Sequence, residues 1–269
     1  MARAVLRTYG APPLDVAVIH GGPGAGGEMA PVARALAAAH GVLEPIQTAT
    51  SLEGQIEELG EILETRGTPP VTLIGFSWGA WLSALTAARH PALVRKLILV
   101  GSGPFEERYA AQIMETRRAR LDTEQGAEYE AILRALGDPA IREKAALLDR
   151  LGLLSERADA YDPLPDPDAD ADRRALRPEV YPRVWRDGKA LRMSGGLLQR
   201  MQQVRCPVVA IHGEHDPHPA EGVREPLSRV LKEFRFVLLP HCGHMPWIER
   251  RARDAFYRLL ADELSSDGG

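Results

Sequence analysis

The sequence predicts an α/β fold in which helices flank one mostly parallel sheet. Short apolar strands alternate with helical patterns over the first third of the chain and again after residue 206. This alternation is typical of parallel strands joined by right-handed crossovers. Residues 104–203 show helical patterns and no convincing strand. We therefore predict a discontinuous α/β core, residues 1–103 and 204–269, that carries a helical insertion, residues 104–203.

Four strands and two helices are predicted before the insertion. The strands are the apolar runs at 16–20, 42–47, 71–76 and 96–102. The run "VTLIGF" at 71–76 is continuously apolar, as expected for a strand covered on both faces. One helix begins at the capping box of Thr50 and Glu53 and ends near Gly67. The other runs from about Trp78 to the break before Pro91.

The insertion contains the helical patterns "YAAQIMETRRARL", "EYEAILRALG" and "IREKAALLDRLGLL". A Pro/Asp-rich stretch at 159–172 follows them, and we expect an exposed loop there, with an ion-binding acidic loop as the alternative. The core pattern then returns. It predicts strands at 207–213 and 234–239, a helix at about 220–232, and a final helix from about Trp247.

Composition excludes several classes of protein. Hydrophobic residues make up 45% and charged residues 26% of the 269 residues, as in ordinary globular domains. A net charge of −4 gives no reason to expect nucleic acid or an anionic membrane as a partner. No apolar run approaches the ~20 residues that span a bilayer, and no signal peptide is expected at the start. Cys206 and Cys242 fall at opposite ends of two predicted strands, so we expect free thiols and a cytoplasmic location.

The stretch "GFSWG" places Ser77 between two glycines where a predicted strand meets a predicted helix. This is the context in which G-x-S-x-G marks a nucleophile held on a tight turn. Residues two before and two after the serine come close together in such a turn, so Gly75 and Gly79 fit where larger residues do not. The plain alternative is a serine at an ordinary helix start.

Two residues in later loops have the chemistry that such a serine needs. Asp216 lies just after the strand at 207–213, and His244 lies just after the strand at 234–239. In a parallel sheet these loops open on the same edge as the loop of Ser77. His244 can take the serine proton as general base, and Asp216 can fix its tautomer and stabilise the imidazolium.

The glycine-rich loop "HGGPG" at 20–24 supplies a possible oxyanion hole. One backbone N–H would come from Trp78, directly after the nucleophile, and the other from Gly22. We also predict that Gly21 and Trp81 line the substrate pocket. For Trp78 and Trp81, packing beneath the insertion is an equal alternative.

Other polar residues near these motifs are given structural roles. The group His212, His215, Asp216 and His218 does not match the spacing of metallo-hydrolases, so no metal is predicted, and no cofactor. His241 competes with His244 as base, and Glu214 competes with Asp216 as acid. The Gly-His-x-Pro context favours His244.

Together, "HGGPG", "GFSWGA", "GEHD" and "CGHMPW" resemble the α/β-hydrolase superfamily, and the first two are most similar to its proline iminopeptidase branch. The resemblance covers about residues 15–103 and 204–264, and it implies that the insertion is a lid. Two departures stand out. Few residues precede the first recognised strand, so the N-terminal strands look shortened or absent. Pro217 follows Asp216 where similar aminopeptidases have Glu.

The expected function is a lidded serine hydrolase that cleaves a small ester or amide through an acyl-enzyme. A proline iminopeptidase-type aminopeptidase and a catalytically silent binding protein on the same fold are the alternatives. Substrates with a free amine are expected to be poor, because Pro217 supplies no charge for the ammonium group. Glu106, Glu107 or Glu179 could supply one from the insertion. The sequence leaves the oligomeric state open.

Overall fold

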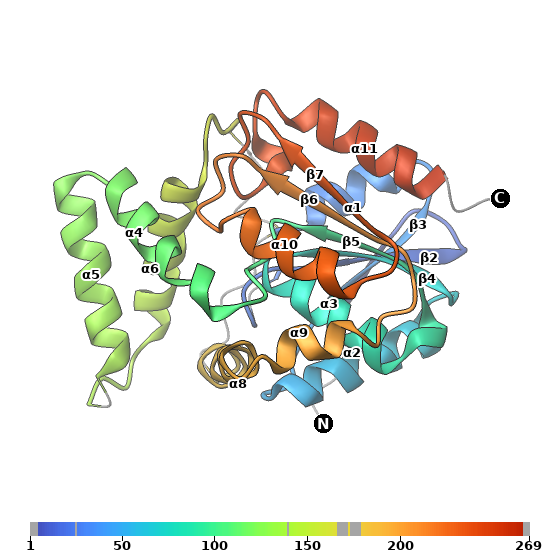
Figure 1. The fold of residues 1–269 in the computed structure, drawn as a ribbon, viewed down its shortest axis with the longest axis horizontal. Coiled ribbons are helices and arrows are strands. Elements are labelled where there is room, and N and C mark those ends of the chain that lie inside the picture. The colour runs from blue at the N-terminus through green and yellow to red at the C-terminus, as the bar shows by residue number, and fades with distance from the viewer. Residues whose placement is uncertain (1–4, 25, 139, 166–171, 173–178, 266–269) are drawn as a thin grey trace.

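The computed structural model is built around a seven-stranded sheet in the order β1-β3-β2-β4-β5-β6-β7. It describes residues 5–24, 26–138, 140–165, 172 and 179–265. Neighbouring strands are parallel except for β1 and β3, and helices cover both faces of the sheet (Figure 1). The predicted fold class is confirmed. The strands are β1 (Val5–Tyr9), β2 (Leu14–Ile19), β3 (Gly41–Ile46), β4 (Val71–Phe76), β5 (Val94–Val100), β6 (Val208–Gly213) and β7 (Phe234–Leu239).

The six predicted strands correspond to β2–β7, with ends that differ by up to two residues. The strand β1 was not predicted. Its sequence, VLRTY, is only partly buried at the edge of the sheet, and it pairs antiparallel with β3 so that Val5 lies opposite Ile46. One short strand therefore precedes β2, where the sequence left open whether such strands are shortened or absent.

Two apolar layers hold the helices against the sheet. One layer joins α2 (Leu52–Arg66), α3 (Trp78–Arg89) and α10 (Glu221–Val230) to one face. The other layer joins α1 (Ala30–Leu36) and α11 (Arg253–Ser265) to the opposite face. Strand β4 contributes alternately to both, with Leu73 in the first layer and Ile74 in the second. Burial of each such side chain contributes about 1.5–3 kcal/mol to the free energy that stabilises the fold.

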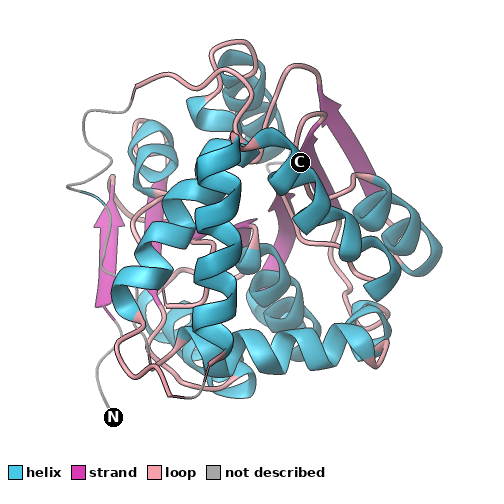
Figure 2. Ribbon diagram, turned by 90° about the vertical axis from the view of Figure 1, so that its left-hand side faces the viewer, coloured by secondary structure: helices cyan, strands magenta, loops and turns pink. Residues whose placement is uncertain are grey.

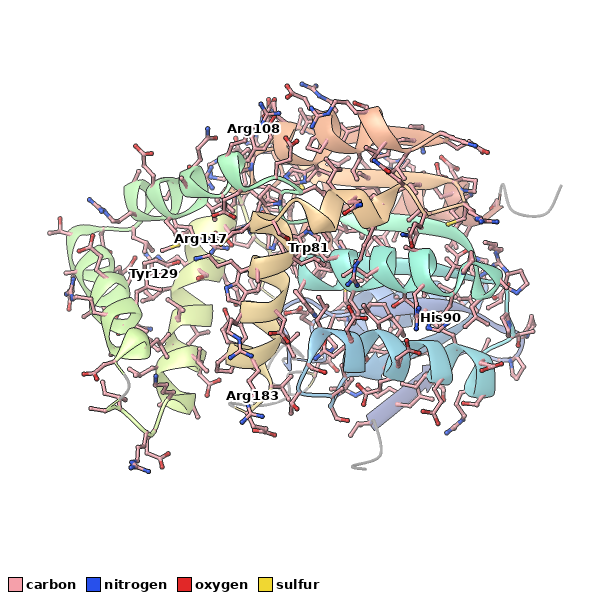
Figure 3. All side chains as sticks on the ribbon, turned by 60° about the horizontal axis from the view of Figure 1, so that its bottom comes forward. Trp81, His90, Arg108, Arg117, Tyr129 and Arg183 are labelled. Atoms are coloured by element: carbon pink, nitrogen blue, oxygen red, sulfur yellow. The ribbon has the colours of Figure 1, made fainter. Side chains whose placement is uncertain are left out.

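Helices occupy much of residues 104–203, and no strand longer than a single bridge residue lies in the part of this segment that the structure describes. The helices α4 (Ala111–Arg120), α5 (Thr123–Gly137) and α6 (Ala145–Asp159) stand beyond the carboxyl ends of the strands (Figure 1), and Figure 2 views the molecule from that side. They enclose a small apolar core of their own that includes Tyr129 and Leu154. Figure 3 shows Tyr129 among these helices. The segment also contains α8 (Tyr181–Met193) and α9 (Gly196–Met201).

Some predicted features have different bounds or lie partly outside the described residues. The helix expected from Trp247 begins at Arg253, because Pro246–Ile248 form a separate 3₁₀ turn. The helix α1 was not predicted. Of the loop expected at 159–172, residues 166–171 lie outside the described residues. The division into core and insertion stays a prediction. In the described part of the chain, no helix is both long and apolar enough for a membrane span.

Candidate active site

Ser77 sits on a strained turn between β4 and α3. Its backbone has φ 53° and ψ −112°, which is unusual for a residue other than glycine. A Cβ atom on Gly75 would lie 2.3 Å from the carbonyl oxygen of Gly79, and one on Gly79 would lie 2.3 Å from that of Ile19. Neither position accepts a side chain. The two glycines therefore allow a turn that lifts Ser77 above the end of the strand.

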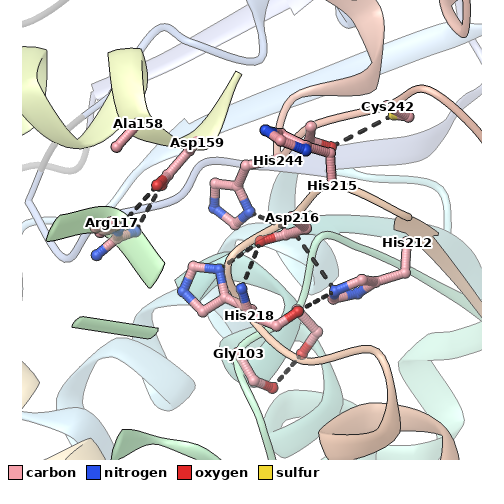
Figure 4. A network of polar contacts seen from close by, with 12 residues as sticks. Gly103, Arg117, Ala158, Asp159, His212, His215, Asp216, His218, Cys242 and His244 are labelled. Atoms are coloured by element: carbon pink, nitrogen blue, oxygen red, sulfur yellow. Dashed lines mark hydrogen bonds and ion pairs between the residues drawn. The ribbon is translucent and has the colours of Figure 1, made fainter. Parts of the chain in front are cut away.

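Asp216 and His244 meet across two loops at the same edge of the sheet. Asp216 follows β6 and His244 follows β7, and both side chains are buried. The Nδ1–H of His244 donates to Oδ2 of Asp216 at 2.7 Å (Figure 4). The structure thus brings these two predicted residues into direct contact, with the Nε2 atom of His244 left as the acceptor.

The ionisation of this pair is set by opposing effects. Burial disfavours the Asp216 carboxylate, but the imidazoles of His244, His218 and His212 outweigh burial and hold its pKa well below its ordinary value. Burial also disfavours the imidazolium of His244, and here the Asp216 carboxylate outweighs it and raises the pKa. These shifts favour an ionised Asp216 and a His244 that readily accepts a proton.

Ser77 and His244 line the same cavity. This cavity has a volume of about 250 Å³, and a second one of about 470 Å³ adjoins it. Ser77 lines both, as do Trp78, Arg117, Trp185 and His218. Ser77 therefore lies where the two cavities meet. The helix α6 contributes Leu148, Leu151 and Gly152 to the wall of the first cavity.

The predicted oxyanion donors differ from their neighbour Gly21 in their hydrogen bonds. The N–H of Gly21 donates to the carboxylate of Glu28, and Gly21 lines neither cavity. Gly22 and Trp78 line the first cavity, and no described group accepts from their backbone N–H groups. Both N–H groups therefore remain available as hydrogen-bond donors, and their role as an oxyanion hole stays a prediction.

Three tryptophans form one wall of the second cavity. Trp81 stacks on Trp185 with ring centroids 6.2 Å apart and an interplanar angle of 3°, and Trp78 meets the same ring edge-on. The indole N–H of Trp81 donates to Gly103 at 3.0 Å. Trp78 and Trp81 therefore line a cavity and also pack against Trp185 of α8. Their place in a substrate pocket stays a prediction. Trp185 was missed, because one aromatic in a helical pattern carries no signal of its own.

His218 is a second imidazole on Asp216. Its Nδ1–H donates to Oδ1 at 2.7 Å, and its backbone N–H donates to the same oxygen at 2.9 Å. Asp216, His218 and His244 each offer a possible metal-ligand atom, and these atoms lie within 4.8 Å of one another. The same groups already pair through hydrogen bonds to the carboxylate, so we read the cluster as a hydrogen-bond network (Figure 4).

Arg117 and Asp159 form a buried ion pair beside the first cavity. The guanidinium of Arg117, on α4, donates to both carboxylate oxygens of Asp159, on α6, at 2.8 and 2.6 Å. The backbone carbonyl of Asp159 also accepts from the N–H of His244 at 3.0 Å. These residues lie 42 positions apart in the sequence, so no local pattern reveals the pair.

Glu249 ties the loop of His244 to the chain that follows α6. This fully buried carboxylate accepts from the backbone N–H groups of Gly243 at 2.9 Å, Tyr161 at 2.8 Å and Asp162 at 2.8 Å. The helical segment and the histidine loop are therefore held in one fixed arrangement.

The remaining candidates lie away from Ser77 or are already paired. The ring of His241 packs beside Tyr161, and its backbone N–H donates to Glu214. Glu106 pairs with Arg229 and Glu179 is exposed. Glu107 lines the second cavity, where it pairs with Arg192 at 2.8 Å.

Known proteins resemble the chain in sequence and in fold. The family model described as alpha/beta hydrolase fold matches residues 16–250. A pimeloyl-[acyl-carrier protein] methyl ester esterase from Nitrosospira multiformis is 26% identical over 73% of this chain and 68% of the relative. The crystal structure of VinJ has a TM-score of 0.70 at 21% identity, covering 97% of this chain and 94% of VinJ.

The crystal structure of a proline iminopeptidase from Mycobacterium smegmatis has a TM-score of 0.61 at 18% identity, covering 97% of this chain and 94% of that one. It shares the fold, and the resemblance to that branch is confirmed at this level. The family model spans most of the chain, and several curated relatives are named as methyl ester esterases. The chain therefore belongs to the alpha/beta hydrolase fold family and is a hydrolase.

Proposed function

We propose that the protein is a serine hydrolase that cleaves a small ester through an acyl-enzyme, with Ser77 as nucleophile, His244 as general base and Asp216 as its acid partner. The observation that carries the proposal is the 2.7 Å hydrogen bond from His244 to Asp216 beside a cavity that Ser77 also lines. A strained turn then presents the serine hydroxyl, instead of packing it.

In the proposed reaction the Ser77 hydroxyl attacks the ester carbonyl while Nε2 of His244 takes its proton. The oxyanion of the tetrahedral intermediate accepts from the N–H groups of Gly22 and Trp78. His244 then protonates the leaving alcohol, and the acyl group stays on Ser77. A water molecule, activated by the same histidine, hydrolyses the acyl-enzyme and restores the serine.

The helical segment 104–203 is proposed to act as a lid over this site. Its helices α4, α5 and α6 stand beyond the carboxyl ends of the strands, and Leu148 and Leu151 line the same cavity as Ser77. Such a cover limits water access to the acyl-enzyme and shapes the space for the substrate.

An ester is the favoured substrate class. Several relatives are named as methyl ester esterases, and Pro217 gives no carboxylate beside Asp216 for a substrate ammonium group. An aminopeptidase is the second candidate, because Glu28, Glu156 and Asp159 line the first cavity. Asp159 is neutralised by Arg117, and Glu28 already holds the N–H of Gly21, which weakens this candidate.

A fluorophosphonate probe and an aryl ester test the proposed triad. Wild type is expected to be labelled, and Ser77→Ala to lose labelling and on the order of 10⁴–10⁶ in turnover. His244→Ala should be inactive, whereas His241→Ala is the matched histidine control and should stay active. More than a tenth of wild-type activity in Ser77→Ala would remove the serine from the mechanism, and no labelling of wild type would favour a silent binding protein.

The substrate class needs a separate comparison. We expect kcat/KM for a short-chain aryl ester to exceed that for a prolyl or alanyl arylamide by at least about tenfold, since a free ammonium group is costly to bury without a carboxylate partner. An arylamide that wins by the same factor would make the protein an aminopeptidase.

A further inference from the structure

His218 lies between Asp216 and the two cavities, and the proposed triad gives this residue no role. Its ring stacks on the ring of His244 with centroids 4.5 Å apart and an interplanar angle of 27°. It lines both cavities together with Ser77. A group that lies beside the general base and in both cavities is within reach of atoms next to the reacting carbonyl.

The hydrogen bonds of His218 fix which of its nitrogens carries the proton. Both oxygens of an ionised Asp216 can only accept, so Nδ1 of His218, 2.7 Å from Oδ1, must be the protonated nitrogen. The carbonyl of His218 accepts from Nε2 of His212 at 2.7 Å, which holds the backbone in place. Nε2 of His218 is then an acceptor, and no group in the described part of the chain donates to it.

We propose that His218 determines specificity by accepting, at Nε2, a hydrogen bond from a hydroxyl or amide N–H of the substrate next to the scissile ester. The proposal rests on the proposed function and names a substrate class for it: esters with a hydrogen-bond donor close to the carbonyl, on the acyl or the alcohol side. Figure 4 shows the rings of His218 and His244 on the side of Asp216 that faces Arg117.

The ring is expected to recognise a donor and not an anion. Burial lowers the pKa of His218 to about 4; the attraction of Asp216 opposes this shift, and the neighbouring His244 adds to it. A neutral imidazole at Nε2 offers a lone pair and no positive charge. Substrate carboxylates therefore gain nothing from this group, whereas hydroxyl and amide donors do.

Two matched pairs of esters test the proposal on the whole enzyme. One pair is a 2-hydroxyacyl aryl ester and its deoxy analogue, and the other is a 2-hydroxyethyl ester and the propyl ester of the same acid. In wild type, kcat/KM of at least one hydroxylated ester should exceed that of its analogue by about 3- to 10-fold, the effect of one neutral hydrogen bond. Each ratio is measured within one enzyme, so a general loss of activity cancels.

The variants separate recognition from a structural role. His218→Phe keeps an aromatic ring and removes the acceptor. In this variant the ratio of kcat/KM for the hydroxylated ester to kcat/KM for its analogue should fall to about one. His218→Gln keeps an acceptor oxygen and should retain part of the preference. His215→Gln is the control, since His215 lies in the same loop and lines neither cavity.

The outcomes distinguish this proposal from the proposed function. A preference in wild type that His218→Phe abolishes and His215→Gln keeps supports the role of His218. An active wild type with no preference in either pair overturns it, even if a variant does not fold. So does a preference that His218→Phe leaves unchanged. A wild type that hydrolyses no ester contradicts the proposed function instead.

Discussion

Replacing Arg117 with methionine should lower the free energy of unfolding more than the loss of any ion pair on the surface does. Methionine keeps much of the length of arginine and removes its charge. The Asp159 carboxylate would then be buried without its partner, at the carboxyl end of α6, where the helix dipole also disfavours a negative charge.

The size of the effect follows from burial and from the two hydrogen bonds. The side chains of Arg117 and Asp159 are 16% and 5% exposed, and both guanidinium contacts are short, at 2.8 and 2.6 Å. Breaking one side of such a buried pair costs about 3–5 kcal/mol, because the remaining charge loses its partner. The double variant Arg117→Met with Asp159→Leu should be at least about 1 kcal/mol more stable than Arg117→Met alone.

Urea unfolding followed by tryptophan fluorescence measures these changes, with aryl ester hydrolysis as a second readout. The exposed pair of Arg150 and Glu128, joined by two contacts of 2.7 and 2.6 Å between α6 and α5, is the control. Arg150→Met should leave the urea midpoint within the error of the wild-type value, because water solvates the exposed Glu128 carboxylate once Arg150 is gone. Equal effects of Arg117→Met and Arg150→Met, or no recovery in the double variant, would refute the reasoning.

Further predictions concern pH and backbone space. Although burial disfavours the imidazolium of His244, the neighbouring carboxylate raises its pKa above 6.5, so kcat/KM should rise with pH through a midpoint above 6.5; a midpoint below it would contradict the assigned base. Burial lowers the pKa of His20 and of His218 from 6.5 to about 4, so at pH values between these limits the unfolded chain binds protons that the folded chain does not. The urea midpoint should therefore decrease as the pH is lowered from 6.5 to 4. A midpoint that increases as the pH is lowered would show the sign to be wrong. Gly79→Ala should destabilise the protein and abolish turnover, because its Cβ would lie 2.3 Å from a carbonyl oxygen. Gly126→Ala, in the helix α5 with nothing within 4 Å, should raise stability by up to about 1 kcal/mol; equal midpoints for the two would contradict the packing argument.

The central strands and the loops that follow them could be predicted from the sequence because their signals are local. β4 is six consecutive buried residues, and the residues at the carboxyl ends of β4, β6 and β7 must share one edge once the strands are parallel. The contact between Asp216 and His244 follows from that topology. The strand β1 escaped prediction because an edge strand that is partly exposed lacks a continuous apolar run.

The interior of the candidate site could not be predicted in the same way. Arg117 and Asp159 meet only through the packing of α4 on α6, and each looks like a surface charge in its own helix. The sequence presents His218 only as a possible metal ligand, because spacing shows how far apart residues are in sequence and not which carboxylate oxygen they share. Trp185 faces Trp81 only because α8 packs closely on α3, with Gly188 against the ring of Trp78.

The three N–H groups that converge on Glu249 have a consequence for exchanging parts between hydrolases. A chimera that takes its helical segment from another enzyme would be joined naturally near residues 104 and 203. Glu249 lies well outside those joints, yet two of its three donors, Tyr161 and Asp162, lie inside the exchanged piece. A foreign segment that places no backbone N–H groups at these two positions would leave the buried carboxylate with the N–H of Gly243 as its one remaining donor, next to His244. Glu249 thus connects the core to the helical segment, and a functional chimera has to keep backbone N–H donors at the positions of Tyr161 and Asp162.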